Sequence, residues 1–194
     1  MRRLLIVAAV VTMVVGAAVP VSAATERYPG YSSELTARWA DYDEIVTLRV
    51  LEIDGMGEYY LDIDLSVCQY EPPVGDSQCW DETGNYVVTD VTMTKRGGTI
   101  DVQVEVEQRY AGSTPPTQWV TITGEWKMTQ PDVRRQRSTT RDPDGWWRST
   151  STTYTDESPD FALEFDVLPI DMPMPPLEAV RAHHYDWIDS RGGG

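Results

Sequence analysis

Residues 59–67 read YYLDIDLSV, and this stretch decides the fold class of the chain. Every odd-numbered residue in it is apolar or aromatic, whereas Asp62, Asp64 and Ser66 occupy even-numbered positions. Successive side chains of a β-strand point to opposite faces of a sheet, so the alternation predicts a strand with one buried and one exposed face.

The same alternation recurs through most of residues 25–168, and residues typical of turns interrupt it at short intervals. Short connections join neighbouring strands in antiparallel order, so we predict an all-β domain built as an antiparallel meander of about nine strands. A β-sandwich is the favoured architecture, because Ile45, Leu51 and Ile53 make one strand apolar on both faces. A closed up-and-down barrel is the alternative.

Residues 169–194 form a proline-rich C-terminal tail. Proline is favoured in the first turn of a helix, so Pro175-Pro176 predicts the start of a short helix that docks on the domain. We expect the chain to be disordered from Arg191 to its end. The apolar residues near one face of the predicted helix are Leu177, Val180, Trp187 and Ile188.

Residues 1–24 have the pattern of a signal peptide. Two arginines precede an apolar run over residues 4–19, and Pro20 and a group of small residues follow. A retained membrane anchor is the alternative interpretation, but the run is shorter than the roughly 20 residues that span a bilayer. We therefore expect a secreted, extracellular protein without membrane insertion.

The chain is strongly acidic, with 31 acidic and 16 basic residues. Removal of residues 1–24 would delete two of the arginines and no acid, which leaves a net charge of −17. A surface of this sign repels phosphate backbones and anionic lipids, so nucleic acid is excluded as a natural partner. Cations and basic partners are favoured instead.

Cys68 and Cys79 are the two cysteines of the chain. In an oxidising compartment such a pair predicts one disulfide, which would close a loop that contains Pro72-Pro73 and Gly75. Two thiols are too few ligands for a metal site, and no histidine is near in sequence to activate a thiol.

No motif predicts a catalytic site, a cofactor or a metal. Asp62 and Asp64 would project from one strand face at a spacing that a glycoside hydrolase tolerates, but exposed strand faces also produce such pairs. His183 and His184 are adjacent and would diverge on a helix, and no acidic turn matches a full calcium loop. Loops that hold phosphates or dinucleotides are also absent from the sequence.

Residues 133–154 form a polar ribbon that turns at residues 142–145 and reverses the charge of the chain locally. Arginine beside exposed tryptophan is typical of a recognition surface, although the arginines of an edge hairpin also prevent aggregation. The candidate binding residues are Arg134, Arg135, Arg137, Arg141, Trp146, Trp147 and Arg148.

These observations favour a non-catalytic secreted β domain that binds a surface, a polysaccharide or a protein partner through the ribbon. A small extracellular hydrolase that uses the paired Asp62 and Asp64 is one alternative. An inhibitor or structural coat protein that presents the disulfide loop is another. The sequence leaves the oligomeric state open.

Overall fold

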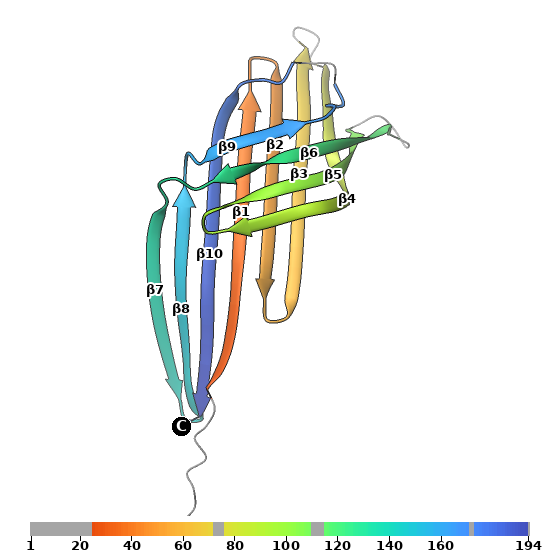
Figure 1. Ribbon diagram of the computed structural model, residues 1–194. Coiled ribbons are helices and arrows are strands. Elements are labelled where there is room, and N and C mark those ends of the chain that lie inside the picture. Colours follow the sequence, from red (N-terminus) through yellow and green to blue (C-terminus); the bar gives the residue numbers. More distant parts are fainter. Residues whose placement is uncertain (1–24, 72–75, 110–114, 171–172, 194) are drawn as a thin grey trace, which may run out of the picture.

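The computed structural model describes residues 25–71, 76–109, 115–170 and 173–193, and they form one antiparallel sheet (Figure 1). The predicted signal peptide and the prolines of the disulfide loop lie outside these residues. The strands are β1 (Glu26–Ala40), β2 (Glu44–Gly55), β3 (Glu58–Glu71), β4 (Asp76–Thr94), β5 (Gly97–Gln108), β6 (Thr117–Lys127), β7 (Asp132–Asp142), β8 (Gly145–Asp156), β9 (Asp160–Phe165) and β10 (Leu177–Gly193).

The strand order is β7-β8-β10-β1-β2-β3-β4-β5-β6-β9. Strands β1 to β6 form the predicted antiparallel meander, and the β7–β8 hairpin joins the opposite edge of the sheet through β10. The all-β prediction is confirmed, whereas the β-sandwich prediction is wrong because all ten strands belong to a single sheet. The barrel alternative is wrong as well, because β7 and β9 are separate edges of a curled, half-barrel sheet.

The curl of the sheet originates in the long strand β4. Its first residues pair with β3 and the rest pair with β5, and the register with β5 shifts between Glu82 and Tyr86. Gly84, inside this shift, has a φ of 83°, a backbone conformation that favours glycine. Strands β4, β5, β6 and β9 therefore cross in front of β1 and β10 (Figure 1).

The hydrophobic core lies on the concave face of the curled sheet, which we call the inner face. Leu35, Leu48 and Leu65 alternate with more exposed residues on three neighbouring strands and are fully buried there. Trp39 of β1 contacts the rings of Phe161 and Phe165 of β9 at centroid distances of 5.6 and 5.2 Å. The edge strand β9 thus packs on β1 in the middle of the same sheet, which explains why strands that resemble sandwich strands need no second sheet.

The predicted C-terminal helix is wrong, because this segment forms β10 between β1 and β8. Ala182 and His184 alternate inward at the period of a strand, and ladders on both sides satisfy the backbone. Arg191 to Gly193, expected to be disordered, pair with β8. No helix long and apolar enough to cross a membrane occurs in the described residues.

The predicted disulfide is confirmed between Cys68 and Cys79. The two cysteines are direct partners in the ladder between β3 and β4, and both are buried. This ladder contains six residue pairs, so the disulfide reinforces a short contact at the point where the sheet begins to curl.

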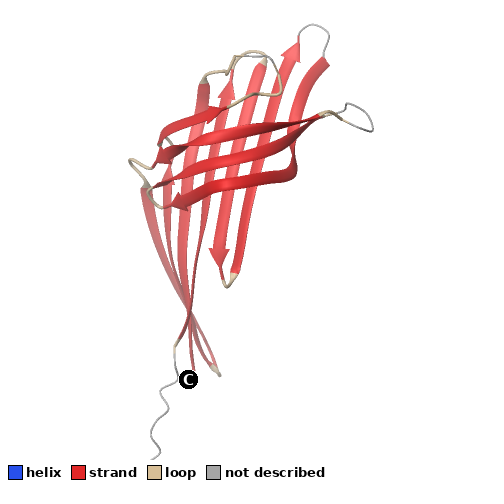
Figure 2. Cartoon of the chain, turned by 45° about the vertical axis from the view of Figure 1, so that its right-hand side comes forward, coloured by secondary structure: helices blue, strands red, loops and turns tan. Residues whose placement is uncertain are grey.

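The molecule divides into a body and an arm. The arm consists of residues 26–31, 135–152 and 186–193, which extend as a single layer beyond the crossing strands (Figure 2). The body is the rest of the described chain and contains the hydrophobic core. Asp156 lies where β8 enters the body, and its carboxylate accepts backbone hydrogen bonds from Thr129, Gln130 and Ser158 of the body.

Candidate binding surface

The seven candidate residues of the ribbon divide between the two faces of the sheet. Residues paired in register share a face, and alternate residues of a strand share it too. By this pairing, Arg134 and Trp147 belong to the outer face, opposite the core. The other five share the inner face with the core and are Arg135, Arg137, Arg141, Trp146 and Arg148.

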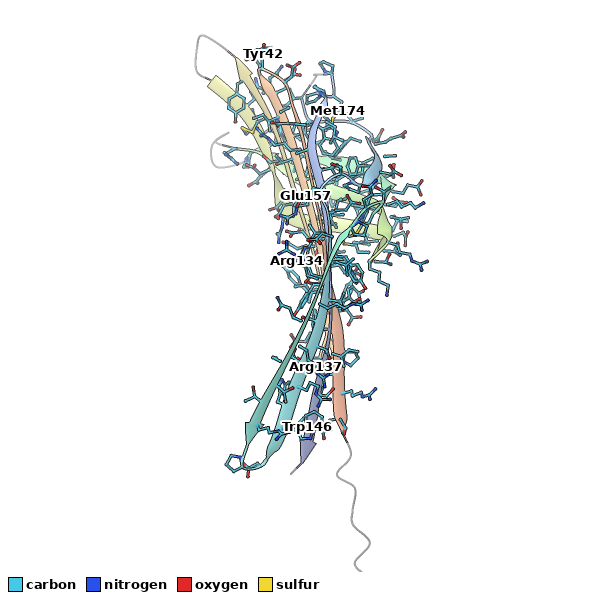
Figure 3. The ribbon with its side chains drawn as sticks, turned by 90° about the vertical axis from the view of Figure 1, so that its left-hand side faces the viewer. Tyr42, Arg134, Arg137, Trp146, Glu157 and Met174 are labelled. Carbon is cyan, nitrogen blue, oxygen red and sulfur yellow. A yellow bond between two sulfur atoms is a disulfide. The ribbon has the colours of Figure 1, made fainter. Side chains whose placement is uncertain are left out.

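The inner-face arginines follow the free edge of the sheet. Arg135, Arg137 and Arg141 are exposed side chains of β7, which pairs only with β8 (Figure 3 labels Arg137). Thr139 occupies the inner-face position of β7 between Arg137 and Arg141, and it pairs with Arg148 of β8. The arm therefore presents a line of cations beside hydroxyl groups.

These four arginines differ from most arginines elsewhere in having no internal counter-ion. Among the described side chains, no carboxylate lies within ion-pair distance of Arg135, Arg137, Arg141 or Arg148. These arginines therefore leave local positive charge on an otherwise acidic protein. The arginines that do form ion pairs with nearby carboxylates are Arg38, Arg49, Arg109, Arg134 and Arg181.

Trp146 and Arg148 form a cation–π contact near the tip of the arm. The Arg148 guanidinium lies 5.0 Å from the centroid of the Trp146 ring. A Cβ atom at Gly192 would come within 2.6 Å of the indole, so only glycine leaves room for this ring (Figure 3 labels Trp146). Arg148 Nε is buried and has no hydrogen-bond partner within the part of the chain that the structure describes.

A cavity of about 730 Å³ lies at the root of the arm. The turn between β4 and β5 brings Lys95 over the inner face, where its Nζ atom lies 5.9 Å from the centroid of the Tyr154 ring. Lys95 has no ion-pair partner in the described chain. The charged and aromatic residues that line the cavity include Tyr31, Asp54, Lys95, Arg135, Arg137, Tyr154 and Asp186.

A buried chain of hydrogen bonds holds Asp186 in the wall of this cavity. Ser33 Oγ lies 2.5 Å from His184 Nδ1, and His184 Nε2 lies 2.8 Å from Asp186 Oδ1. The residue types are those of a serine hydrolase, but Ser33 is only 2% exposed and its hydroxyl is not accessible to a substrate. The hydrogen bonds from Ser33 through His184 therefore orient the Asp186 carboxylate.

Glu52 is buried between the arm and the core, where it pairs in register with Ser33 of these hydrogen bonds. Burial raises its pKa, and the hydroxyl groups of Tyr31 and Tyr59 offset part of the rise. Burial together with the charge of Glu52 raises the pKa of Tyr31 to about 12, so Tyr31 remains a neutral hydrogen-bond donor beside the cavity.

On the outer face of the sheet, the two remaining candidate residues each contact a neighbouring side chain. Arg134 is bound to Asp132 of the same strand, with Nε and Oδ2 3.0 Å apart. Trp147 stacks on Tyr28 at a centroid distance of 6.0 Å. These two candidate residues are therefore separated from the other five by the thickness of the sheet.

The paired carboxylates of the hydrolase alternative lie on the outer face of the body. Arg49 Nη1 is 3.3 Å from Asp62 Oδ2 and 2.9 Å from Asp64 Oδ2, and its Nε is 2.6 Å from Glu34. Both aspartates thus face a guanidinium instead of an apolar pocket that would keep one of them protonated. Within the described residues, no cluster of histidine, cysteine, aspartate and glutamate has the geometry of a metal site.

Residues that the sequence analysis missed complete the inner surface, above all Lys95, Tyr31 and Asp186. The turn of the ribbon would have allowed one further prediction from the sequence. It pairs Asp142 with Gly145, and this register fixes which arginines share a face of the sheet. No local signal places Lys95, since it reaches the arm through the curl of the sheet.

Comparison of the chain with protein-family models, with curated proteins and with solved structures gave no match.

Proposed function

We propose that this protein is a non-catalytic, extracellular domain that binds an acidic polysaccharide along the inner face of its arm. The observation that carries the proposal is the line of inner-face arginines without counter-ions in a chain of formal net charge −15. Such cations attract anionic groups of a ligand, because no carboxylate of the described chain neutralises them.

The shape of the surface supports an extended ligand. Arg135 and Arg141 are six residues apart on an open strand, a span of about 20 Å at the usual rise per residue. Thr139 and Thr150 lie between the charges, and Trp146 adds a flat ring near the tip. Hydroxyl groups and an aromatic ring beside arginines match the hydroxyl groups, ring faces and carboxylates of an acidic sugar chain.

The charge of the remaining surface favours a polysaccharide over nucleic acid. The acidic body repels a polymer that carries one phosphate at every nucleotide, and this repulsion extends over about 10 Å at ordinary ionic strength. A sugar polymer with one carboxylate per unit carries its charges farther apart than the roughly 1.7 Å of a nucleic-acid duplex, and it also offers neutral hydroxyl groups. The signal-peptide pattern and the disulfide support an extracellular site of action.

Binding of polygalacturonate, measured by isothermal titration calorimetry at low ionic strength, tests the proposal, with dextran as the neutral control. We expect the Arg135→Ala/Arg137→Ala double variant to lose about tenfold or more in affinity, the usual cost of removing arginine anchors. Added salt should weaken binding to the unaltered protein.

The matched control is Arg134→Ala, which removes an arginine from the same strand but from the outer face. Its affinity should stay within about twofold of the unaltered protein, since exposed residues outside a binding surface contribute little. Equal losses in both variants, or no binding of polygalacturonate at all, would contradict the proposal.

A further inference from the structure

We infer that the inner face of the arm is closed at its root, so that the cavity there receives the end of a polysaccharide chain. This inference rests on the proposed function and adds that the protein recognises a chain terminus and not an internal stretch. It follows from how side-chain burial changes along the inner face and from the chemistry of the cavity.

Burial increases stepwise from the arm to the body. Arg141 at the tip and Arg137 in the middle are exposed, and Trp146, the partner of Arg141, is half-buried. Nearer the body, His184 is 4% exposed, and Leu35 in the next inward row is completely buried. A polymer that lies along β8 and β10 therefore meets buried residues at the body, whereas Val133 of β7 is 44% exposed at the same level.

The turn between β4 and β5 forms the wall at this end. Lys95 in the turn lies over Tyr154, which is the next inner-face residue of β8 after the arm ends at Thr152. Both Lys95 and Tyr154 line the cavity. Met93 beside the turn is buried in the core, which fixes the turn in place. Lys95 and this turn thus bound the cavity on the side of the body.

The charges of the cavity fit one acidic sugar unit. Lys95, Arg135 and Arg137 supply positive charge for a carboxylate. Asp54 and Asp186 supply acceptors for hydroxyl groups, and His184 orients the second of them. A unit with one carboxylate and several hydroxyl groups satisfies both sets, whereas a heavily sulfated unit would bring anions against the two aspartates. The chemical class inferred is therefore a terminal uronic acid.

The stoichiometry of binding to galacturonic acid oligomers tests the inference. Two sizes are compared by calorimetry and sedimentation: one just long enough to cover the arm and one several times longer. A protein that binds a terminus should bind one copy per chain at both lengths. Binding in proportion to chain length would overturn the inference while leaving the proposed function intact, and absence of binding would contradict the proposed function itself.

Chemical changes at the chain ends provide a second readout. Borohydride opens the terminal ring at the reducing end, and a lyase leaves an unsaturated ring at the other end. One of these changes should weaken binding of the short oligomer at least tenfold, and the other should have little effect. Equal affinity for both altered oligomers and the unaltered one would overturn the inference.

Lys95→Ala tests the wall of the cavity, and Lys127→Ala is its control, because Lys127 is an exposed lysine of β6 that does not line the cavity. The first variant should reduce discrimination between an intact and an altered chain end several-fold, and the second should leave it unchanged. Full discrimination in Lys95→Ala would overturn the assignment of the cavity as the terminal subsite.

Discussion

The body and the arm contain stretches of the same strands but differ in what covers their inner face. In the body, β1 directs Leu35, Ala37 and Trp39 into a core that the crossing strands close. In the arm, the same face of the same strand carries Arg27 and Pro29, and both are exposed. The comparison shows that one continuous strand serves stability at one end and exposes a polar surface at the other.

The two regions also treat charge differently. In the body, Arg49 is surrounded by three carboxylates, and Arg38 and Arg181 each contact a glutamate. On the inner face of the arm, Arg135 and Arg137 have no such partner among the described side chains. Ion pairs thus neutralise Arg38, Arg49 and Arg181 in the body, whereas the arginines on the inner face of the arm keep their charge where a ligand has access.

The largest expected effect is on stability when a core side chain of the body is shortened. Leu48→Ala should lower the free energy of unfolding by about 2–5 kcal/mol, because it leaves a cavity among fully buried residues. Ile188→Ala in the arm is the matched control and should cost less than about 1 kcal/mol, since Ile188 is 46% exposed. Urea unfolding measures both; equal costs would show that the arm carries a core of its own.

Removal of the disulfide should have the next largest effect. The Cys68→Ser/Cys79→Ser double variant should lose about 2–3 kcal/mol of stability, because the unfolded chain is no longer constrained by the closed loop. Intact mass before and after reduction checks that the bond is present, and urea unfolding measures the loss. An unchanged unfolding midpoint after reduction would show that the curl of the sheet does not depend on this bond.

A smaller, pH-dependent effect is expected at Glu52, in the layer between the two regions. Its pKa is raised in the folded protein, so protonation favours folding. This contribution is fully present below the ordinary glutamate pKa of about 4.3 and is lost as the pH rises through the folded-state value. The unaltered protein should therefore become less stable relative to Glu52→Gln as the pH rises, which urea unfolding across this range measures; a constant difference would contradict the prediction.

The smallest expected effect on stability is that of Arg137→Ala. Its side chain is exposed and unpaired, so the free energy of unfolding should change by less than about 0.5 kcal/mol while ligand affinity falls. Thermal unfolding without ligand separates the two effects. A stability loss as large as that of a core substitution would show that the arm arginines have a structural role.

Much of the local structure was predictable from the sequence. The alternation in residues 59–67 and the turn at residues 142–145 correspond to β3 and to the β7–β8 hairpin. The two cysteines form the predicted disulfide, and five of the seven ribbon residues share one face. These features follow from period-two patterning, turn chemistry and short separations along the chain, which neighbouring residues encode.

The remaining features depend on contacts between distant residues. The apolar spacing of Leu177, Val180 and Trp187 resembles a helix, yet ladders with β1 and β8 hold this segment as a strand. Likewise, only the curl of the sheet at β4 brings Lys95 over Tyr154 and buries His184 beside Ser33. The sequence by itself determined that strands form and where cations gather, because both are local properties. Only the tertiary structure decided which faces are covered, since burial depends on segments that are far apart in the chain.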